Sequence, residues 1–149
     1  MYFRGDAESA ERAVAQWCRD QGIQHALAGF SAAWRLAPEV RYSVGAVYVD
    51  HHGFDPEVFG KLSAYQGAKR VETGANLLLW RPFDHSVFAD TQPSGPEKVT
   101  VTSALQAYLD LSRQAGRGEE AAAAIYAKHL EPELTSAAEQ VEETRDAEL

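Results

Sequence analysis

The sequence has a single cysteine, Cys18, and no long hydrophobic run. One cysteine excludes a disulfide within the chain, and nothing indicates an oxidising compartment. No apolar run reaches the roughly 20 residues that a membrane-spanning helix needs. The first residues also lack the apolar stretch and cleavage site of a secretory signal. We therefore predict a cytoplasmic protein without membrane contact.

Positive charge is scarce. The chain has 14 Lys and Arg against 22 Asp and Glu, a formal net charge of −8. Residues 131–149 account for −6 of this charge, so residues 1–130 sum to only −2. Neither part offers the basic surface that binding to a nucleic-acid backbone requires. The composition predicts that this chain alone binds DNA and RNA poorly.

The length of 149 residues is enough for one compact domain with a core, and too short for two. We predict a single domain over residues 1–132, followed by an acidic tail over residues 133–149. The tail has few large apolar side chains that could anchor it, so a frayed helix and a disordered segment are both compatible with its sequence.

Apolar residues at helical spacing predict an amphipathic helix over residues 7–20. Ala10, Val14 and Trp17 fall on one face at i, i+4 and i+7. Glu11 is expected largely on the opposite, polar side. This helix would pack one face on the core.

Helix and strand signals alternate in the centre of the chain. A short buried helix is predicted for residues 30–36, entered through a tight turn at Gly29, and another for residues 57–67. Residues 41–50 alternate and are rich in Val and Tyr, which predicts a strand. Residues 75–83 form a nearly continuous apolar run, which favours a strand covered on both faces.

A helix is predicted to begin at Ser103. Gln106 stands three positions on, the S-x-x-Q arrangement in which side chains satisfy free amides at a helix start. We expect Leu105, Tyr108 and Leu109 to face the core. With a Pro/Gly turn and an extended return in the preceding segment, these elements predict an α+β fold. The fold would contain a small, mostly antiparallel sheet packed with helices and a C-terminal helical pair.

Gly116 and Gly118 separate this helix from a last one predicted over Glu119–Leu130, which Pro132 would follow just past its end. The segment from Gly116 to Gly118 lacks the Gly-Lys-Ser/Thr ending of a phosphate-binding loop. The next helix also begins with acidic residues, which would repel a bound phosphate. We interpret both glycines as residues that allow positive φ.

Charged residues of both signs surround this turn. They could form local ion pairs only, or they could present a docking face to a partner protein. We carry the second hypothesis forward as a predicted partner-binding site, which consists of Asp110, Arg113, Arg117, Glu119 and Glu120.

No residue pattern predicts catalysis, a metal ion or a cofactor. His51 and His52, flanked by Asp50 and Asp55, are the only cluster that resembles metal ligands. Adjacent strand residues point to opposite faces, whereas a metal site needs three or four converging ligands. Ser31 lacks the following glycine of a nucleophile elbow, and no strand is evident before it. We predict a protein that is not an enzyme.

Four segments resemble, in order and spacing, the C-terminal domain of AbiEi-type antitoxins. They are ALAGFSAAWRLAP, VYVD, GANLLLWRPFD and TSALQAYLDLSRQAGRGEEAA. The resemblance covers roughly His25 to Leu130, and LQAYLDL…GRGEEAA is its most specific part. It implies a non-enzymatic antitoxin and transcriptional regulator of a type IV, abortive-infection toxin–antitoxin system. Its partner would be a nucleotidyltransferase-type toxin encoded nearby.

In that family a winged helix-turn-helix binds the operon's promoter. The residues before the resemblance amount to one amphipathic helix, so we expect this chain to lack its own DNA-binding module. Contact with DNA would then occur only through a separate winged-helix module. A repressor that binds DNA directly is kept as an alternative.

The predicted fold is also similar in outline to nucleotidyltransferases, in which a Gly-Ser turn precedes a strand bearing carboxylates. Gly29 and Ser31 precede the strand that ends at Asp50, and Asp84 follows the next strand. A minimal or degenerate nucleotidyltransferase is therefore the second alternative. In that case these four residues would bind the nucleotide, with the two aspartates holding the metal.

Overall fold

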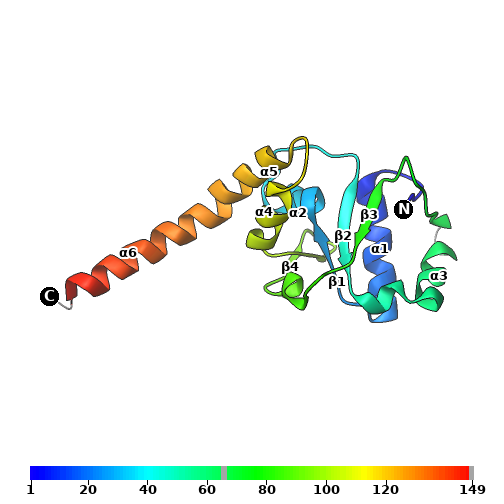
Figure 1. The fold of residues 1–149 in the computed structure, drawn as a ribbon, viewed down its shortest axis with the longest axis horizontal. Helices are drawn as coiled ribbons and strands as arrows, with labels where there is room; N and C mark the ends of the chain where they lie inside the picture. The colour runs from blue at the N-terminus through cyan, green and yellow to red at the C-terminus, as the bar shows by residue number, and fades with distance from the viewer. Residues whose placement is uncertain (65–66, 148–149) are drawn as a thin grey trace.

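The computed structural model describes residues 1–64 and 67–147. It has the predicted α+β composition, with a five-stranded sheet and helices around it (Figure 1). The strands are β1 (His25–Ala28), β2 (Gly45–Val49), β3 (Leu77–Trp80), β4 (Gln92–Ser94) and β5 (Val99–Val101).

The α-helices are α1 (Ala7–Gln21), α2 (Gly29–Leu36), α3 (Pro56–Ala64), α4 (Ala104–Ser112), α5 (Gly118–Ile125) and α6 (Glu131–Ala147). Short helical turns occur at η1 (His51–Phe54), η3 (His85–Phe88) and η4 (Tyr126–Leu130). A helix with the length and apolarity of a membrane span is absent from the described residues.

The sheet is mixed, so the prediction of a mostly antiparallel sheet is wrong. Its order is β3-β2-β1-β5-β4. Strand β1 is antiparallel to β2, and β4 to β5, whereas β1 and β5, and likewise β2 and β3, are parallel. Strands β2 and β3 are parallel because the connection that contains α3 returns the chain to the end of the sheet at which β2 started, whereas β5 pairs with β1 across all the intervening elements.

Strand β1 is absent from the sequence prediction, although it lies at the centre of the sheet. It has only four residues, two of which are alanine, a residue with weak β preference. All four are buried because β1 has a neighbour on each side. It ends directly before Gly29, so the expectation that no strand precedes Ser31 is also wrong.

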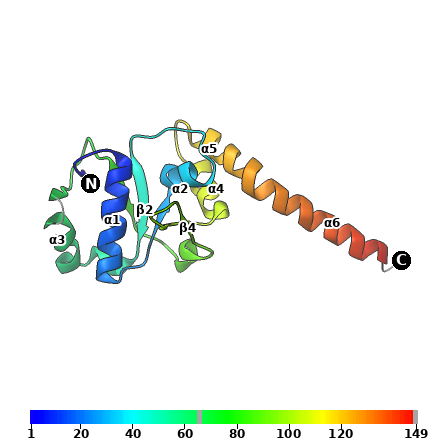
Figure 2. The same ribbon diagram turned by 180° about the vertical axis from the view of Figure 1, so that it is seen from behind.

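Helix α1 covers one face of the sheet (Figure 2). The predicted apolar face is confirmed, since Ala10, Val14 and Trp17 are all buried in the main core. Asp6 caps the helix by accepting a hydrogen bond from the Ser9 amide at 2.8 Å. This face of the sheet therefore carries the largest part of the hydrophobic stabilisation.

The opposite face of the sheet carries a smaller apolar cluster. Strands β1 and β2 contribute mostly alanine there, and the turn η3 covers them with two larger side chains. The ring of Trp80 packs beside this cluster, in an edge-to-face arrangement with Tyr48 at 5.4 Å between centroids. The buried members are Ala26, Ala28, Ala46, Tyr48, Val87 and Phe88.

The central predicted elements are present with different limits. The predicted strand over residues 75–83 contains β3, but Leu78 is 39% exposed because β3 lies at the sheet edge. The expectation of a strand covered on both faces is therefore wrong. The helix predicted over residues 57–67 corresponds to α3, and residues 65–66 of that prediction lie outside the described residues.

Helices α4 and α5 form an antiparallel hairpin that packs against α2. Ser103 caps α4 as predicted, accepting a hydrogen bond from the Gln106 amide at 3.1 Å. The predicted inward face is wrong for Leu105 and Leu109, whereas Tyr108 is partly buried and packs against the main core. Leu105 and Leu109 are exposed, whereas Ala107 and Leu111 are fully buried.

The helix predicted to end at Leu130 continues beyond Pro132. Between α5 and α6 the turn η4 has π-helical geometry, in which the Glu131 amide donates to the carbonyl of Tyr126. This wider turn immediately precedes Pro132, which lacks an amide hydrogen. Helix α6 then projects away from the body (Figure 1). That residues 133–149 form a unit separate from the domain stays a prediction.

Candidate partner-binding site

Four of the five residues predicted to bind a partner lie on the surface of the α4–α5 turn. They are Arg113, Arg117, Glu119 and Glu120. Arg117 holds Glu120 in a two-pronged pair, with 2.9 Å from Nε to Oε2 and 2.8 Å from Nη2 to Oε1. These hydrogen bonds lower the pKa of Glu120 and raise that of Arg117. The turn thus combines a local ion pair with two further exposed charges.

The fifth residue, Asp110, points toward the sheet instead. Its Oδ1 accepts hydrogen bonds from the Tyr48 hydroxyl at 2.8 Å and from Nε2 of Gln106 at 3.0 Å. Burial raises the pKa of Asp110 above its usual value, although these hydrogen bonds oppose the shift. Asp110 therefore connects α4 to β2 and is not part of the exposed turn.

The two glycines of the turn have different roles. Gly116 has a φ of 79°, as predicted for a residue that reverses the chain. Gly118 has no positive φ, so that part of the prediction is wrong. A Cβ at Gly118 would lie 2.5 Å from the carbonyl oxygen of Leu111. Gly118 therefore lets the start of α5 approach the end of α4 closely.

The outer side of this hairpin has a groove of about 400 Å³, which we call the α4–α5 groove. Alanine side chains of α5 form part of its lining, and two tyrosine rings lie in it 6.0 Å apart between centroids. One carboxylate is present. The lining residues are Tyr108, Ser112, Glu119, Ala122, Ala123 and Tyr126.

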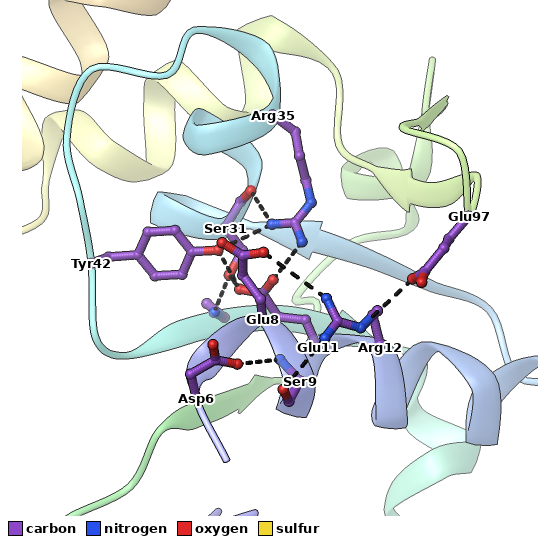
Figure 3. A network of polar contacts seen from close by, with 10 residues as sticks. Asp6, Glu8, Ser9, Glu11, Arg12, Ser31, Arg35, Tyr42 and Glu97 are labelled. Atoms are coloured by element: carbon purple, nitrogen blue, oxygen red, sulfur yellow. Dashed lines mark hydrogen bonds and ion pairs between the residues drawn. The ribbon is translucent and has the colours of Figure 1, made fainter.

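A buried polar network holds α2, against which this hairpin packs (Figure 3). At its centre is Glu11 of α1, which is completely buried. Its Oε1 accepts hydrogen bonds from Ser31 at 2.5 Å and from the Tyr42 hydroxyl at 2.8 Å. Its Oε2 lies 2.7 Å from Nη2 of Arg35. The network joins α1 and α2 to the segment before β2.

Glu11 is predicted on the polar side of α1, which the structure contradicts. Glu11 lies at i−3 and i−7 from Val14 and Cys18, both buried, and this spacing was the available signal. The network leaves no room for a side chain at Gly45, because a Cβ there would lie 2.5 Å from Oε1 of Glu11 and 2.6 Å from Oγ of Ser31.

The four residues of the nucleotide-binding alternative fall at two ends of the sheet. The β1–β2 register pairs Ala28 with Ala46 and His25 with Val49. Gly29 and Ser31 therefore follow one end of this pair, and Asp50 follows the other. Asp84 lies at the same end as Asp50, because its neighbour His85 places Nε2 3.6 Å from Oδ1 of Asp50.

Both aspartates cap short helical turns. Asp50 accepts a hydrogen bond from the His51 amide at 2.9 Å, and Asp84 accepts one from the Ser86 amide at 2.7 Å. Ser31 also has a structural role, since its Oγ accepts from the Ala46 amide at 2.9 Å. In the part of the chain that the structure describes, no three His, Cys, Asp or Glu side chains form a group able to hold a metal ion.

A further cavity of about 370 Å³ lies beside the edge strand β3. Leu78, Leu79 and Trp80 line one side of it. The guanidinium of Arg81 stands 4.4 Å from the centre of the Phe54 ring, a cation–π contact. Leu78 also lines a second cavity together with Gln114 and Arg117, so the α4–α5 turn comes close to this edge of the sheet.

Fold and surface together define a small α+β domain with a mixed sheet and an exposed helical hairpin. Residues 4–131 match the family model described as transcriptional regulator, AbiEi antitoxin, type IV toxin–antitoxin system. The chain belongs to this family, as the resemblance indicated. The match includes α1 and stops at the first residue of α6. Curated proteins and solved structures gave no match.

Proposed function

We propose that this chain acts as an antitoxin that counteracts a nucleotidyltransferase-type toxin encoded nearby. The observation that carries this proposal is the family match over residues 4–131, which spans the sheet, α1 and the helical hairpin. The hairpin supplies a surface suited to protein contact, with exposed charge at its turn and an apolar groove on its outer side.

Action by contact, rather than by catalysis, agrees with the placement of the polar residues. The side chains that a nucleotidyltransferase would need are occupied in caps and in the buried network, with Ser31 bound to Glu11 and Asp84 bound to the Ser86 amide. Gly29 and Asp50 follow opposite ends of the β1–β2 pair. These residues therefore support the fold.

The family description includes transcriptional regulation, which requires a contact with DNA. The net charge of −8 opposes binding to phosphate groups by this chain. We therefore propose that a separate winged-helix module supplies the DNA contact. A promoter fragment that this chain alone retards in a gel, with a shift that weakens as salt rises, would contradict this part of the proposal.

The experiment that tests the main proposal measures growth when the product of the neighbouring toxin reading frame is expressed with and without this chain. Rescue of growth by the chain is the expected result, and no rescue would contradict the proposal. Calorimetry with the two separately purified proteins then shows whether the rescue involves direct contact. Magnesium-dependent nucleotide binding that disappears in Asp50→Asn would instead favour the nucleotidyltransferase alternative.

The charged turn is expected to contribute specificity to contact with a partner protein. Arg117→Glu breaks the ion pair with Glu120 and places like charges together, whereas Arg117→Glu with Glu120→Arg restores a pair of reversed direction. Both variants are expected to fold. If the turn contacts the toxin, both variants lose affinity for the toxin. Wild-type affinity in both variants would exclude the turn from the interface.

A further inference from the structure

Strand β3 forms one edge of the sheet, and the cavity of about 370 Å³ lies beside it. We call this cavity the β3 cleft; one side of it consists of Leu78, Leu79, Trp80 and Arg81. We propose that the β3 cleft binds an extended acidic segment of a partner protein, which adds to β3 as a further strand. The inference goes beyond the antitoxin function and does not depend on it. It follows from the backbone of β3, the walls of the cleft and the charge of the cleft.

The backbone of β3 has hydrogen-bonding groups that face away from the sheet. Successive residues of a strand turn these groups to opposite sides. The Gly45 amide of β2 donates to the carbonyl of Asn76 at 3.0 Å, so Leu77 faces outward. Met1 binds Leu77 there, since its amino group donates to the Leu77 carbonyl at 2.8 Å and its carbonyl accepts from the Leu77 amide at 3.3 Å. By the same alternation, Leu79 turns its amide and carbonyl outward.

The outward groups of Leu79 are available to a further strand. Among the described residues, neither group has a backbone hydrogen-bond partner outside the sheet. Such an edge is a template for pairing with another chain. The contact of Met1 with Leu77 shows that this edge accepts a backbone partner two residues earlier.

The shape of the cleft suits an extended chain. Four successive residues of one segment line it, and successive side chains of a strand point to opposite faces, so the cleft follows the edge of β3. The rings of Phe54 in η1 and Phe59 in α3 form part of the other wall, 6.3 Å apart between centroids. In peptide binding by strand addition, backbone hydrogen bonds give affinity and pockets for alternate side chains give specificity.

The charge of the cleft selects an acidic segment. Its charged lining side chains are Arg70 and Arg81, although the chain has a net charge of −8. Both arginines are exposed, and neither forms an ion pair within the described residues. The guanidinium of Arg81 is held against the Phe54 ring. Carboxylates of an incoming strand would supply charge-assisted hydrogen bonds to these guanidinium groups.

The test begins without a known partner. A library of random heptapeptides displayed on phage is selected against the full chain. The enriched peptides are expected to combine Asp or Glu with apolar residues. The peptide that binds most tightly is then synthesised, and its affinity is measured by calorimetry for the wild type and for charge-reversal variants.

Arg81→Glu is expected to weaken peptide binding by about tenfold or more, the effect of losing a central contact. The matched control is Arg145→Glu, which makes the same charge change at an exposed residue of α6 and should bind like the wild type. Circular dichroism and thermal unfolding check that the variants fold. Arg70→Glu repeats the test on the second arginine, in case the loss of the contact with Phe54 unfolds Arg81→Glu.

A second measurement distinguishes strand addition from contact between side chains. The amides of the selected peptide are methylated one at a time. Methylation of every second amide should abolish binding, because these amides face β3, whereas methylation of the amides between them should be tolerated. A loss of affinity without this alternation would overturn the strand geometry.

Three further results would overturn the inference. They are a selection that enriches no peptide, enriched peptides without acidic residues, and wild-type affinity in both Arg81→Glu and Arg70→Glu. Displacement of the peptide by a short DNA duplex would assign the two arginines to nucleic acid and would also overturn it. The toxin takes no part in these measurements, so their failure leaves the antitoxin proposal unaffected. Acidic peptides that lose affinity in both variants and show the alternating methylation pattern support the β3 cleft as the site.

Discussion

The carboxylate of Glu11 lies 2.7 Å from the guanidinium of Arg35, with Glu11 completely buried and the Arg35 side chain 14% exposed. Burial alone would lower the pKa of Arg35, but the charge of Glu11 and the contact with Tyr42 raise it overall. The two groups therefore form a charged pair inside the protein. Because α2 packs against both helices of the hairpin, this pair also supports the groove.

Glu11→Gln should lower the free energy of unfolding by about 3 kcal/mol, because it leaves the guanidinium of Arg35 partly buried without its counter-charge. Urea unfolding followed by circular dichroism measures the change. Glu8→Gln is the matched control on the same helix. Glu8 and Arg12 are well exposed, so the effect there should stay below about 1 kcal/mol. Equal effects of the two substitutions would show that the buried pair has no special role.

Two glycine substitutions should change stability in opposite directions. Gly118→Ala should lower the free energy of unfolding by about 1–3 kcal/mol, because the added methyl group would meet the Leu111 carbonyl. Gly60→Ala should raise it by roughly 0.5–1 kcal/mol, since Gly60 is inside α3 with nothing within 4 Å of the added atom. Thermal unfolding of both variants, compared with the wild type, shows whether Gly118→Ala is destabilised and Gly60→Ala is stabilised.

The fold could be predicted where the signal is local. The cap at Ser103 and the alternating β2 segment depend on neighbouring residues, and both are present. Strand β1 could not be found this way, because its two alanines become a central strand only when β2 and β5 pair with it. The sheet was predicted as mostly antiparallel for the same reason, since parallel pairing with distant strands leaves no local pattern.

Cys18 should react slowly with thiol reagents in the folded protein. Burial raises the pKa of its thiol to about 12, so the reactive thiolate is scarce at pH 8. Labelling with a chromogenic disulfide reagent should proceed at the rate of unfolding, and it should become fast in concentrated urea. Rapid labelling of folded protein would contradict the buried position of Cys18 against the sheet.

Stability should fall as the pH drops below about 6.5. Burial lowers the pKa of His25, whose Nδ1 donates to the carbonyl of Ile23 at 3.2 Å. Between this lowered pKa and the ordinary value near 6.5, the unfolded chain binds more protons than the folded one, so acid favours unfolding. Urea midpoints measured from pH 8 to 5 should therefore decline.

The variant His25→Gln is the control for this pH dependence. It removes the buried imidazole and leaves the exposed histidines His51, His52 and His85 in place. Its urea midpoint should depend less on pH over the same range. If the wild type and His25→Gln decline in parallel, another group is responsible for the loss of stability in acid.

The exposed position of the charged turn was predictable, but the packing of the helices that carry it was not. The charged turn was correctly placed on the surface, because Gly116 reverses the chain there. The orientation of α4 was not, since the prediction of an inward face for Leu105 and Leu109 is wrong. Gly118 lets α5 approach the end of α4 at Leu111, Ala107 and Leu111 are buried, and Leu105 and Leu109 are left outside. Which residues of α4 face the core depends on the distance between the packed helices, and no local sequence pattern gives that distance.

The pairing of Leu27 with Val101 has a consequence for synthesis of the protein. The central strand is made early, but the strand that completes it on one side is encoded far downstream. During translation, β1 can pair with β2, but its other hydrogen-bonding edge stays unpaired until β5 has left the ribosome. Nascent chains that stop before β5 should therefore be substrates for chaperones and proteases, so that only chains extending past β5 accumulate.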